Sequence, residues 1–369
     1  VKVLVVFAFL MVAVLFMVWF ERKVISDMQS RIGPDRAGPW GLLQTLADGI
    51  KLFFKEDLLP ERADRRIFRL APYLSIVPAF AAFAIIPVGG TISIAGHKTF
   101  LQLADPPVGV LFLLAMSSIA VYGIMLAGWS SGSKYPLLGS VRASAQMVSY
   151  EAAMSLAVAA AVLSAGSLST QDIVHSQAGW RWNLWVLGVV PFVIYLIAAT
   201  AETNRPPFDL VEAEQELVGG FHTEYSSISF ALFFLAEFMN TVTVSAVAVT
   251  LFLGGPNGPH IGFLPSLWPI VYFFAKLLVF LFVYVWFRAT LPRFRYDQLM
   301  DLGWKKLIPL ALYWLLLIAA LRVGRDQGWN SGVVLAGGVA AGAIAWAGLS
   351  AALRQGENVE PDVAVGQLP

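Results

Sequence analysis

The sequence predicts an all-α integral membrane protein, a polytopic bundle of eight to nine transmembrane helices. Of its 369 residues, 58% are hydrophobic and only 13% are charged, whereas a soluble domain carries about 25% charged residues. A helix needs about 20 apolar residues to cross a hydrocarbon core of ~30 Å. Nine segments meet or nearly meet this requirement: residues 1–20, 73–89, 107–129, 144–166, 184–203, 227–253, 267–288, 306–321 and 333–353.

The first segment is too long and too uniformly apolar for the core of a signal peptide, so we expect it to be retained as a span. We expect residues 1–353 to form a single bundle and residues 354–369 to be a disordered tail. The last span, 333–353, is rich in Gly and Ala, and Gly338 and Gly342 have GxxxG spacing. That composition suits close packing against a neighbouring helix and predicts no chemical role.

The distribution of Lys and Arg predicts the orientation. Most of them lie in the tail and in the loops after the first, third, fifth and seventh spans. The opposite loops hold only Lys2, Lys98, Arg181, Arg322 and Arg325. The positive-inside rule therefore places the large charged loops in the cytoplasm and the N-terminus outside.

The first of these loops, 21–72, contains apolar residues at helical spacing: Leu42, Leu43, Leu46, Ile50, Phe53 and Phe54. Gly38-Pro39 precedes this stripe and Pro60 ends it. We therefore expect an amphipathic helix that lies in the membrane interface, because a plain solvated linker would not keep a 3.6-residue apolar period.

Several ionisable residues fall within or beside the spans: Glu151, Glu202, Glu237 and Lys276. An ionised side chain at the bilayer centre costs at least ~2.5–3.5 kcal/mol, so it normally faces a cavity or a partner. One interpretation is a Glu237–Lys276 ion pair that locks two helices together. That pair leaves the other carboxylates without a cation, which favours ion handling.

The cytoplasmic loop 204–226 adds a dense set of acids. After Pro206-Pro207, a helix would place Asp209, Glu212 and Glu216 on one face, with Glu214 between them. On a wet surface this is an ordinary solvated acidic face. Beside Glu202 and an apolar stretch, however, the cluster would be partly desolvated, which raises carboxyl pKa values and allows proton uptake near neutral pH.

Other chemistries are excluded or unsupported. The chain has no cysteine, which excludes disulfides, thiolate-held iron–sulfur clusters and Cys-type zinc sites. Its four histidines form no helical pair for a haem. The net charge of +1 gives no argument for nucleic acid. We expect no redox cofactor and no metal in this chain.

Several motifs together point to a family. They lie at residues 21–24, 29–34, 41–44, 47–53, 149–151, 201–210, 212–218, 231–237 and 292–300. The set resembles the quinone-chamber, or heel, membrane subunit of bacterial proton-pumping NADH:quinone oxidoreductase (respiratory complex I). The resemblance covers spans one to eight. Eight spans are usual in that family, and nine are expected here. The resemblance therefore does not say what the ninth span does or which extra partner it would contact.

The resemblance implies a location, a substrate and partners. The chain would lie in the cytoplasmic (inner) membrane of a bacterium, against other membrane-arm and peripheral-arm subunits of complex I. Its substrate would be ubiquinone or menaquinone, with flavin and iron–sulfur clusters in partner subunits. By resemblance, Arg22, Arg31, Arg36, Asp48 and Lys51 would line the chamber and its portal.

The resemblance also implies a coupling route that takes charge from the chamber to the membrane arm. The acidic chain would be Glu151, Glu202, Asp209, Glu212, Glu214, Glu216 and Glu237. The supporting cations would be Arg205, Lys276, Arg288, Arg293 and Arg295. Two alternatives stay open: the related membrane subunit of an energy-converting hydrogenase, and a stand-alone ion transporter. A pure scaffold is disfavoured by the intramembrane acids.

Overall fold

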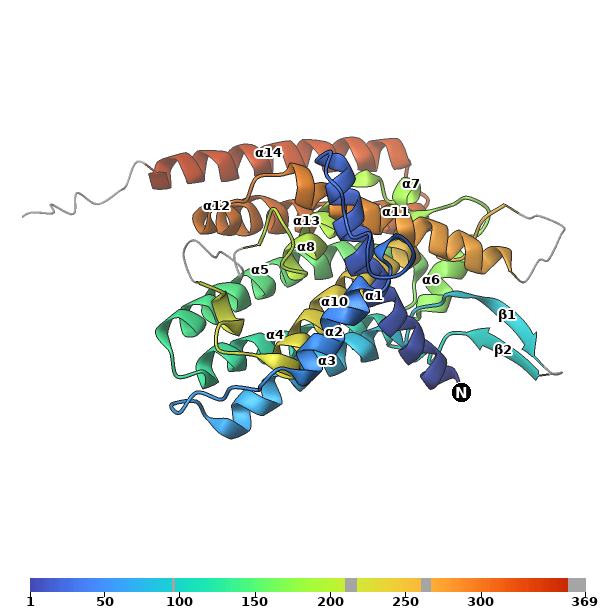
Figure 1. Ribbon diagram of the computed structural model, residues 1–369. Helices are drawn as coiled ribbons and strands as arrows, with labels where there is room; N and C mark the ends of the chain where they lie inside the picture. Colours follow the sequence, from blue (N-terminus) through green and yellow to red (C-terminus); the bar gives the residue numbers. More distant parts are fainter. Residues whose placement is uncertain (95–96, 210–217, 260–266, 358–369) are drawn as a thin grey trace, which may run out of the picture. The chain divides into compact units, whose positions relative to one another are not determined.

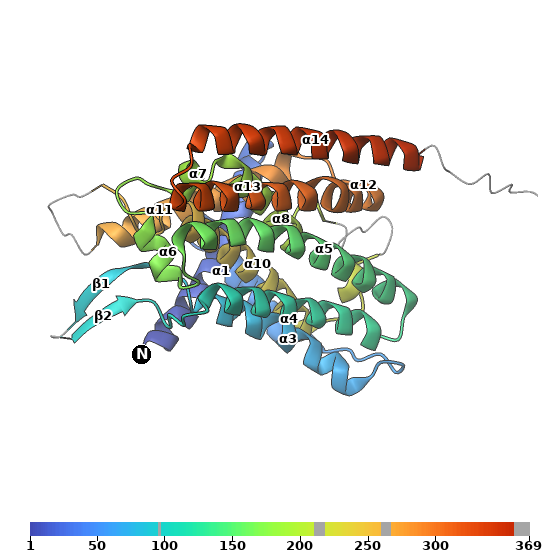
Figure 2. The same cartoon turned by 180° about the vertical axis from the view of Figure 1, so that it is seen from behind.

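The computed structural model describes residues 1–94, 97–209, 218–259 and 267–357. It divides into two compact units, Val1–Ala311 and Leu312–Pro369. The elements are almost all helical (Figures 1 and 2): α1 Lys2–Met28, η1 Pro39–Gly41, α2 Gln44–Phe54, α3 Arg65–Phe83, β1 Gly89–Ile94, β2 His97–Leu101, α4 Gly109–Ser130, α5 Lys134–Ala165, α6 Thr170–Ser176, α7 Asn183–Val186, α8 Val189–Glu202, η2 Gly220–His222, α10 Ser227–Phe252, α11 Trp268–Thr290, α12 Tyr296–Asp301, the π-helical turn η3 Leu302–Leu307, α13 Ile308–Asp326 and α14 Ser331–Glu357.

The predicted all-α polytopic membrane protein is confirmed. Within the described residues, seven helices are long and apolar enough to cross a membrane, and two shorter apolar helices, Val189–Glu202 and Gly332–Gly348, accompany them. The predicted fifth span, 184–203, is broken. Gly188 has a left-handed φ of 79° and separates α7 from α8, a conformation that a residue without a Cβ adopts at little cost.

Helices α3, α4 and α5 pack side by side in the first unit (Figure 2). Small residues allow the backbones to approach closely. A Cβ at Gly123 of α4 would overlap Ser75 Oγ of α3, and one at Gly128 would overlap the Pro136 carbonyl oxygen of α5. Either glycine therefore fixes a helix contact that a larger residue would force apart.

The amphipathic helix expected in the first loop is α2, which has no buried residue. Its apolar side chains Leu46, Ile50 and Phe53 are all exposed. Hydrogen bonds tie its end to the start of α10, since the Ser227 hydroxyl oxygen lies 3.0 Å from the Leu52 carbonyl and 2.8 Å from the Lys55 carbonyl. The helix itself is confirmed, whereas its place in the interface stays a prediction.

The segment that leads into α10 is anchored by Tyr225. This ring stacks on Phe68 at 3.9 Å, and its hydroxyl donates to the Phe68 carbonyl at 3.0 Å. Burial raises the pKa of Tyr225 to about 12, so the phenol stays protonated and remains a donor at physiological pH.

Two features of the first unit were not predicted. The first is the antiparallel hairpin β1–β2, in which Ile92 pairs with Thr99 (Figure 1). The second is the extension of α1 eight residues beyond the expected end of the first span, to Met28. This extension carries Glu21 and Arg22 on the helix instead of in a loop.

The second unit is a helical hairpin of α13 and α14. The Tyr313 hydroxyl donates to the Gly338 carbonyl at 3.1 Å, and a Cβ at Gly342 would overlap the Tyr313 ring. This close approach is what the GxxxG spacing predicts. Helix α14 ends at Glu357, so residues 354–357 are helical, contrary to the predicted tail. Residues 358–369 lie outside the described part.

Candidate functional site

An ion network centred on two buried side chains, Glu21 and Arg205, joins α1, the residues after α8, α10 and α11. The Glu21 carboxylate accepts from Arg205 Nη1 at 3.3 Å and also from Arg288 Nη1. Arg205 Nε lies 3.3 Å from Glu237 Oε1, and its guanidinium lies 4.1 Å from the centre of the Phe238 ring. Arg205 is thus shared between two carboxylates in a place with little water, where charge interactions are strong.

Two residues of this network lie where an apolar helical segment ends. Glu21 directly follows the apolar part of α1, which ends at Phe20, and Arg205 follows the end of α8 at Glu202. The side chains of Glu21 and Arg205 are 9% and 6% exposed, which means that each needs its partner. Glu21 was not predicted as a site residue, although its place at the end of an apolar run was a signal.

The alternative interpretation, a Glu237–Lys276 ion pair, is not what the structure contains. Lys276 Nζ donates to the carbonyl oxygens of Leu253, Gly255 and Asn257 at 2.8, 2.9 and 2.7 Å. Its ammonium also lies 4.8 Å from the centre of the Trp182 ring. Lys276 is therefore bound at the C-terminal end of α10, whereas Glu237 is paired with Arg205 nearer the other end.

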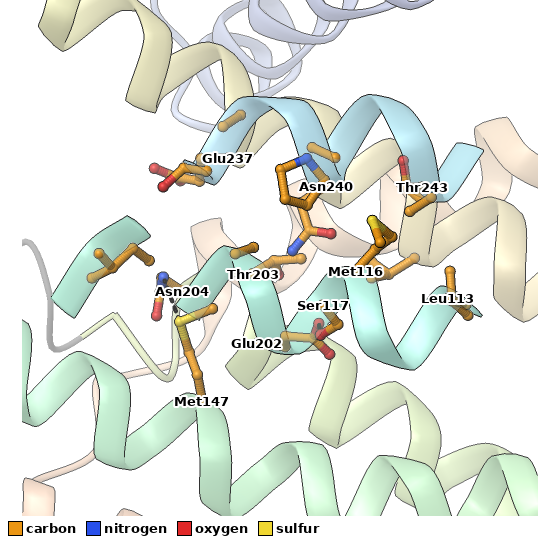
Figure 3. Close-up of a pocket in the computed structure, with 18 of the residues that line it drawn as sticks. Leu113, Met116, Ser117, Met147, Glu202, Thr203, Asn204, Glu237, Asn240 and Thr243 are labelled. Atoms are coloured by element: carbon orange, nitrogen blue, oxygen red, sulfur yellow. Dashed lines mark hydrogen bonds between the residues drawn. The ribbon is translucent and has the colours of Figure 1, made fainter. Parts of the chain in front are cut away.

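Two of the predicted acids line one partly open cavity (Figure 3). Glu237, Asn240 and Thr243 of α10 line one part of it, and Glu202 and Ser117 line another. The volume of the cavity is about 80 Å³. One water needs about 10–15 Å³, so several waters would fit by size. Most of the lining is apolar, and its polar side chains include Glu237, Asn240, Thr243, Glu202 and Ser117.

Two serines on α4 contact two of the acids. The Ser117 hydroxyl donates to Glu202, and the Ser118 hydroxyl donates to Glu151. Glu202 is 3% exposed, and within the described residues its Oε2 has no hydrogen-bond partner. Neither serine was predicted, because a serine in an apolar helix has no distinctive pattern.

A surface pocket lies beside the ion network. Its polar lining is Glu21, Arg22, Arg31 and Arg288, and its apolar lining includes Phe234 and Phe238. Arg22 Nη1 pairs with Asp48 Oδ2 of α2 at 2.6 Å. Of the predicted portal residues, Arg22, Asp48 and Arg31 are therefore gathered near one pocket. Arg36 and Lys51 are exposed and do not line it.

The start of the acidic loop is held by the segment after α11. Arg293 Nη2 lies 3.1 Å from Asp209 Oδ2, and Asp209 is buried. The Phe294 N–H donates to the Pro207 carbonyl at 3.0 Å. Arg295 is the N-cap of α12 and its N–H donates to Gln298. The predicted residues Glu212, Glu214 and Glu216 lie outside the described part.

Gln146 of α5 organises the same loop from the other side. Its amide donates to the carbonyl oxygens of Ala201 at 2.7 Å and Phe208 at 2.8 Å. Its Oε1 is buried with no partner in the described part of the chain. Gln146 was missed as a positioning residue, since an amide near a predicted span indicates only that a polar partner is needed.

No group of three His, Cys, Asp or Glu that could hold a metal ion occurs among the described residues. What the described part does contain is a set of carboxylates, arginines and hydroxyls around a cavity and a surface pocket. Such a set can store and shift charge and can bind a polar oxygen.

Comparison with known proteins identifies the family. The family model for NADH dehydrogenase matches residues 1–319. The chain is 60% identical to the H-type subunit of NADH-quinone oxidoreductase from Frankia alni, over 86% of its own length and 71% of the relative's. It is 54% identical to the protein of the same name from Streptomyces avermitilis, over 89% of its own length and 74% of the relative's. The chain therefore belongs to the NADH dehydrogenase family, among the relatives named as the H-type subunit of NADH-quinone oxidoreductase.

Proposed function

We propose that this chain is the membrane subunit of NADH-quinone oxidoreductase that contributes to the quinone-binding chamber and couples quinone reduction to proton translocation. The observation that carries this proposal is the ion network Glu21–Arg205–Glu237. One end of the network lines the surface pocket, and the other end lines the partly open cavity. It is a direct electrostatic link between a place for a quinone and a set of acids.

The surface pocket has the chemistry that a quinone needs. The head group of a quinone offers carbonyl oxygens, which accept hydrogen bonds from a guanidinium. The isoprenoid tail of the quinone needs apolar walls. Arg22 and Arg31 supply donors, and Phe234 and Phe238 supply apolar surface. Arg36 and Lys51 would act at the rim, where their exposure suits contact with partner subunits or lipid head groups.

The coupling step follows from the charge change in the chamber. Reduction of a quinone to a quinol takes up two electrons and two protons, so the quinol is neutral and any acid near the chamber that supplies a proton is left one charge more negative until it is reprotonated. Arg205, which lies 3.3 Å from both Glu21 and Glu237, would then favour one carboxylate over the other. Glu237, Glu202 and Glu151 would pass the change onward, with Asp209, Glu212, Glu214 and Glu216 beside the entrance.

The cations have different parts in this proposal. Arg205 and Arg288 hold the charge network together, and Arg293 and Arg295 position the loop segments. Lys276, bound to backbone carbonyls, stabilises the far end of α10 and takes no step in coupling. These contacts support a structural part for Lys276 in place of the expected part beside the acidic chain.

The electrons would stay in partner subunits that hold flavin and iron–sulfur clusters, and this chain would handle the quinone and the charge. The chain would lie in the bacterial cytoplasmic membrane with its N-terminus outside. The relatives described above are named for NADH-quinone oxidoreductase, which favours this complex over a hydrogenase-type complex or a stand-alone ion transporter.

The test is Glu237→Gln in the assembled enzyme. We expect slower quinone reduction and fewer protons pumped per electron, because glutamine cannot change its charge. NADH oxidation by ferricyanide, measured in washed membranes, reports how much peripheral arm is attached to the membrane arm. Full pumping per electron in an assembled Glu237→Gln enzyme would rule out Glu237 as an obligatory member of the route.

A further inference from the structure

Two adjacent serines of α4 each reach a carboxylate on a different helix. Ser117 donates to Glu202 of α8, and Ser118 donates to Glu151 of α5 (Figure 3 shows the first pair). Consecutive residues of an α-helix point about 100° apart, since a turn contains 3.6 residues. One turn of α4 therefore presents one hydroxyl to each neighbour.

The two carboxylates also interact with each other electrostatically. Tyr195 of α8 and Tyr284 of α11 also interact electrostatically with Glu202. Ionised carboxylates repel each other, so charging Glu151 and Glu202 together is costly, and hydrogen-bond donors help to decide which of them holds the charge.

Ser117 matters most in this arrangement. Glu202 is 3% exposed, and its second oxygen has no partner in the described part of the chain. Losing the Ser117 hydroxyl would leave a buried carboxylate without a donor there, which is costly for the charged form. Ser118 differs, because its hydroxyl also lies 3.1 Å from the Leu114 carbonyl, a bond that serines in membrane helices commonly make to their own backbone.

We propose that Ser117 and Ser118 are positioning residues for the coupling acids: together they hold Glu202 and Glu151 at a fixed spacing and let Glu202 carry a negative charge. This inference rests on the proposed function, because it assumes that these acids take part in coupling. The serines touch neither the quinone pocket nor its arginines, so their effect should appear in turnover and not in quinone binding.

The experiment compares Ser117→Ala, Ser117→Cys and Ser117→Thr in the assembled NADH-quinone oxidoreductase. Threonine keeps the hydroxyl, and its extra methyl group can enter the cavity that Ser117 lines. Cysteine has nearly the same size but is a weaker donor. The matched control is Ser245→Ala on α10, a fully buried serine whose hydroxyl donates to the Thr241 carbonyl of its own helix at 2.7 Å.

We expect Ser117→Ala to lower the maximal rate of quinone reduction about tenfold or more, the size of a lost hydrogen bond to a charged group. The KM for quinone should stay unchanged. Ser117→Thr should restore the rate, Ser117→Cys should fall between, and Ser245→Ala should match the parent enzyme. All rates are divided by ferricyanide reductase activity, and the cysteine and threonine variants decide the question if the alanine variant does not assemble.

Equal loss in the threonine and alanine variants, or a change in KM alone, would overturn the role of the hydroxyl. Glu202→Gln distinguishes a failure of the serine inference from a failure of the proposed function. If Glu202→Gln lowers coupled turnover and Ser117→Ala leaves it intact, the inference fails and the proposed function stands. If Glu202→Gln has no effect, the acidic route through Glu202 fails and the inference fails with it.

Discussion

Replacing Glu21 by glutamine removes the negative charge that two arginines share. The Arg205 side chain is 6% exposed, and losing a charged hydrogen bond there costs about 1.5–3 kcal/mol. The full cost of about 3–5 kcal/mol for isolating a buried charge is not reached, because Arg205 keeps Glu237 at 3.3 Å. The Arg288 side chain is 34% exposed, so its contact adds at most about 1 kcal/mol. The two losses together come to about 3 kcal/mol.

The measurement uses the assembled enzyme in membranes. We expect the temperature at which half of the quinone reductase activity is lost to fall by at least a few degrees in Glu21→Gln. We also expect Arg205 to turn fully to Glu237, which should slow quinone reduction. Asp27→Asn is the matched control, since Asp27 lies on the same helix and is exposed.

A double-mutant comparison gives the sharper test. Glu21 should be coupled to Arg205 more strongly than to Arg288, because the first pair is more buried. The coupling is the extent to which the effects of Glu21→Gln and each arginine substitution fail to add. Equal coupling to both arginines, or an effect of Glu21→Gln no larger than that of Asp27→Asn, would refute the assignment of Glu21 to the ion network.

Two further predictions concern the ends of helices. Lys276→Met removes three hydrogen bonds to backbone carbonyls and should lower the free energy of unfolding by about 3 kcal/mol. The number of protons pumped per electron should stay unchanged. A lower number in intact enzyme would return Lys276 to the coupling route. Gly342→Ala should loosen the hairpin of α13 and α14, because its Cβ would overlap the Tyr313 ring. Gly337→Ala on the same helix meets nothing within 4 Å and should be neutral or stabilising, as measured by protease resistance of the tail in membranes.

The membrane spans could be predicted from the sequence because hydropathy reports directly on the solvent of each segment. The break at Gly188 and the extension of α1 were missed because hydropathy describes the polarity of a segment and not the course of its backbone. An apolar run ends where charged residues begin, but a helix continues as long as its backbone hydrogen bonds are favourable. Glu21 and Arg22 are charged and helical, so the apolar run ended before the helix did.

The wrong partner for Lys276 has a geometric cause. Glu237 lies about 15 Å along α10 from its start, and Lys276 lies about 12 Å along α11 from its own start, at 1.5 Å per residue. Both are near the middle of a span, which suggested a pair. The sequence does not show in which direction a long side chain extends. Lys276 extends toward the carbonyls after α10, and Glu237 turns to an arginine that follows α8.

The position of that arginine gives a physical basis for the proposed route through the acids. Arg205 is equally close to Glu21 and Glu237, at 3.3 Å each, so any event that neutralises one carboxylate strengthens its hold on the other. Thermodynamic linkage makes the effect reciprocal: a charge change at Glu237 must alter the affinity of the pocket beside Glu21 by the same free energy. The proposed coupling needs this property, and the reach of one guanidinium, set between two helices far apart in sequence, is sufficient to provide it.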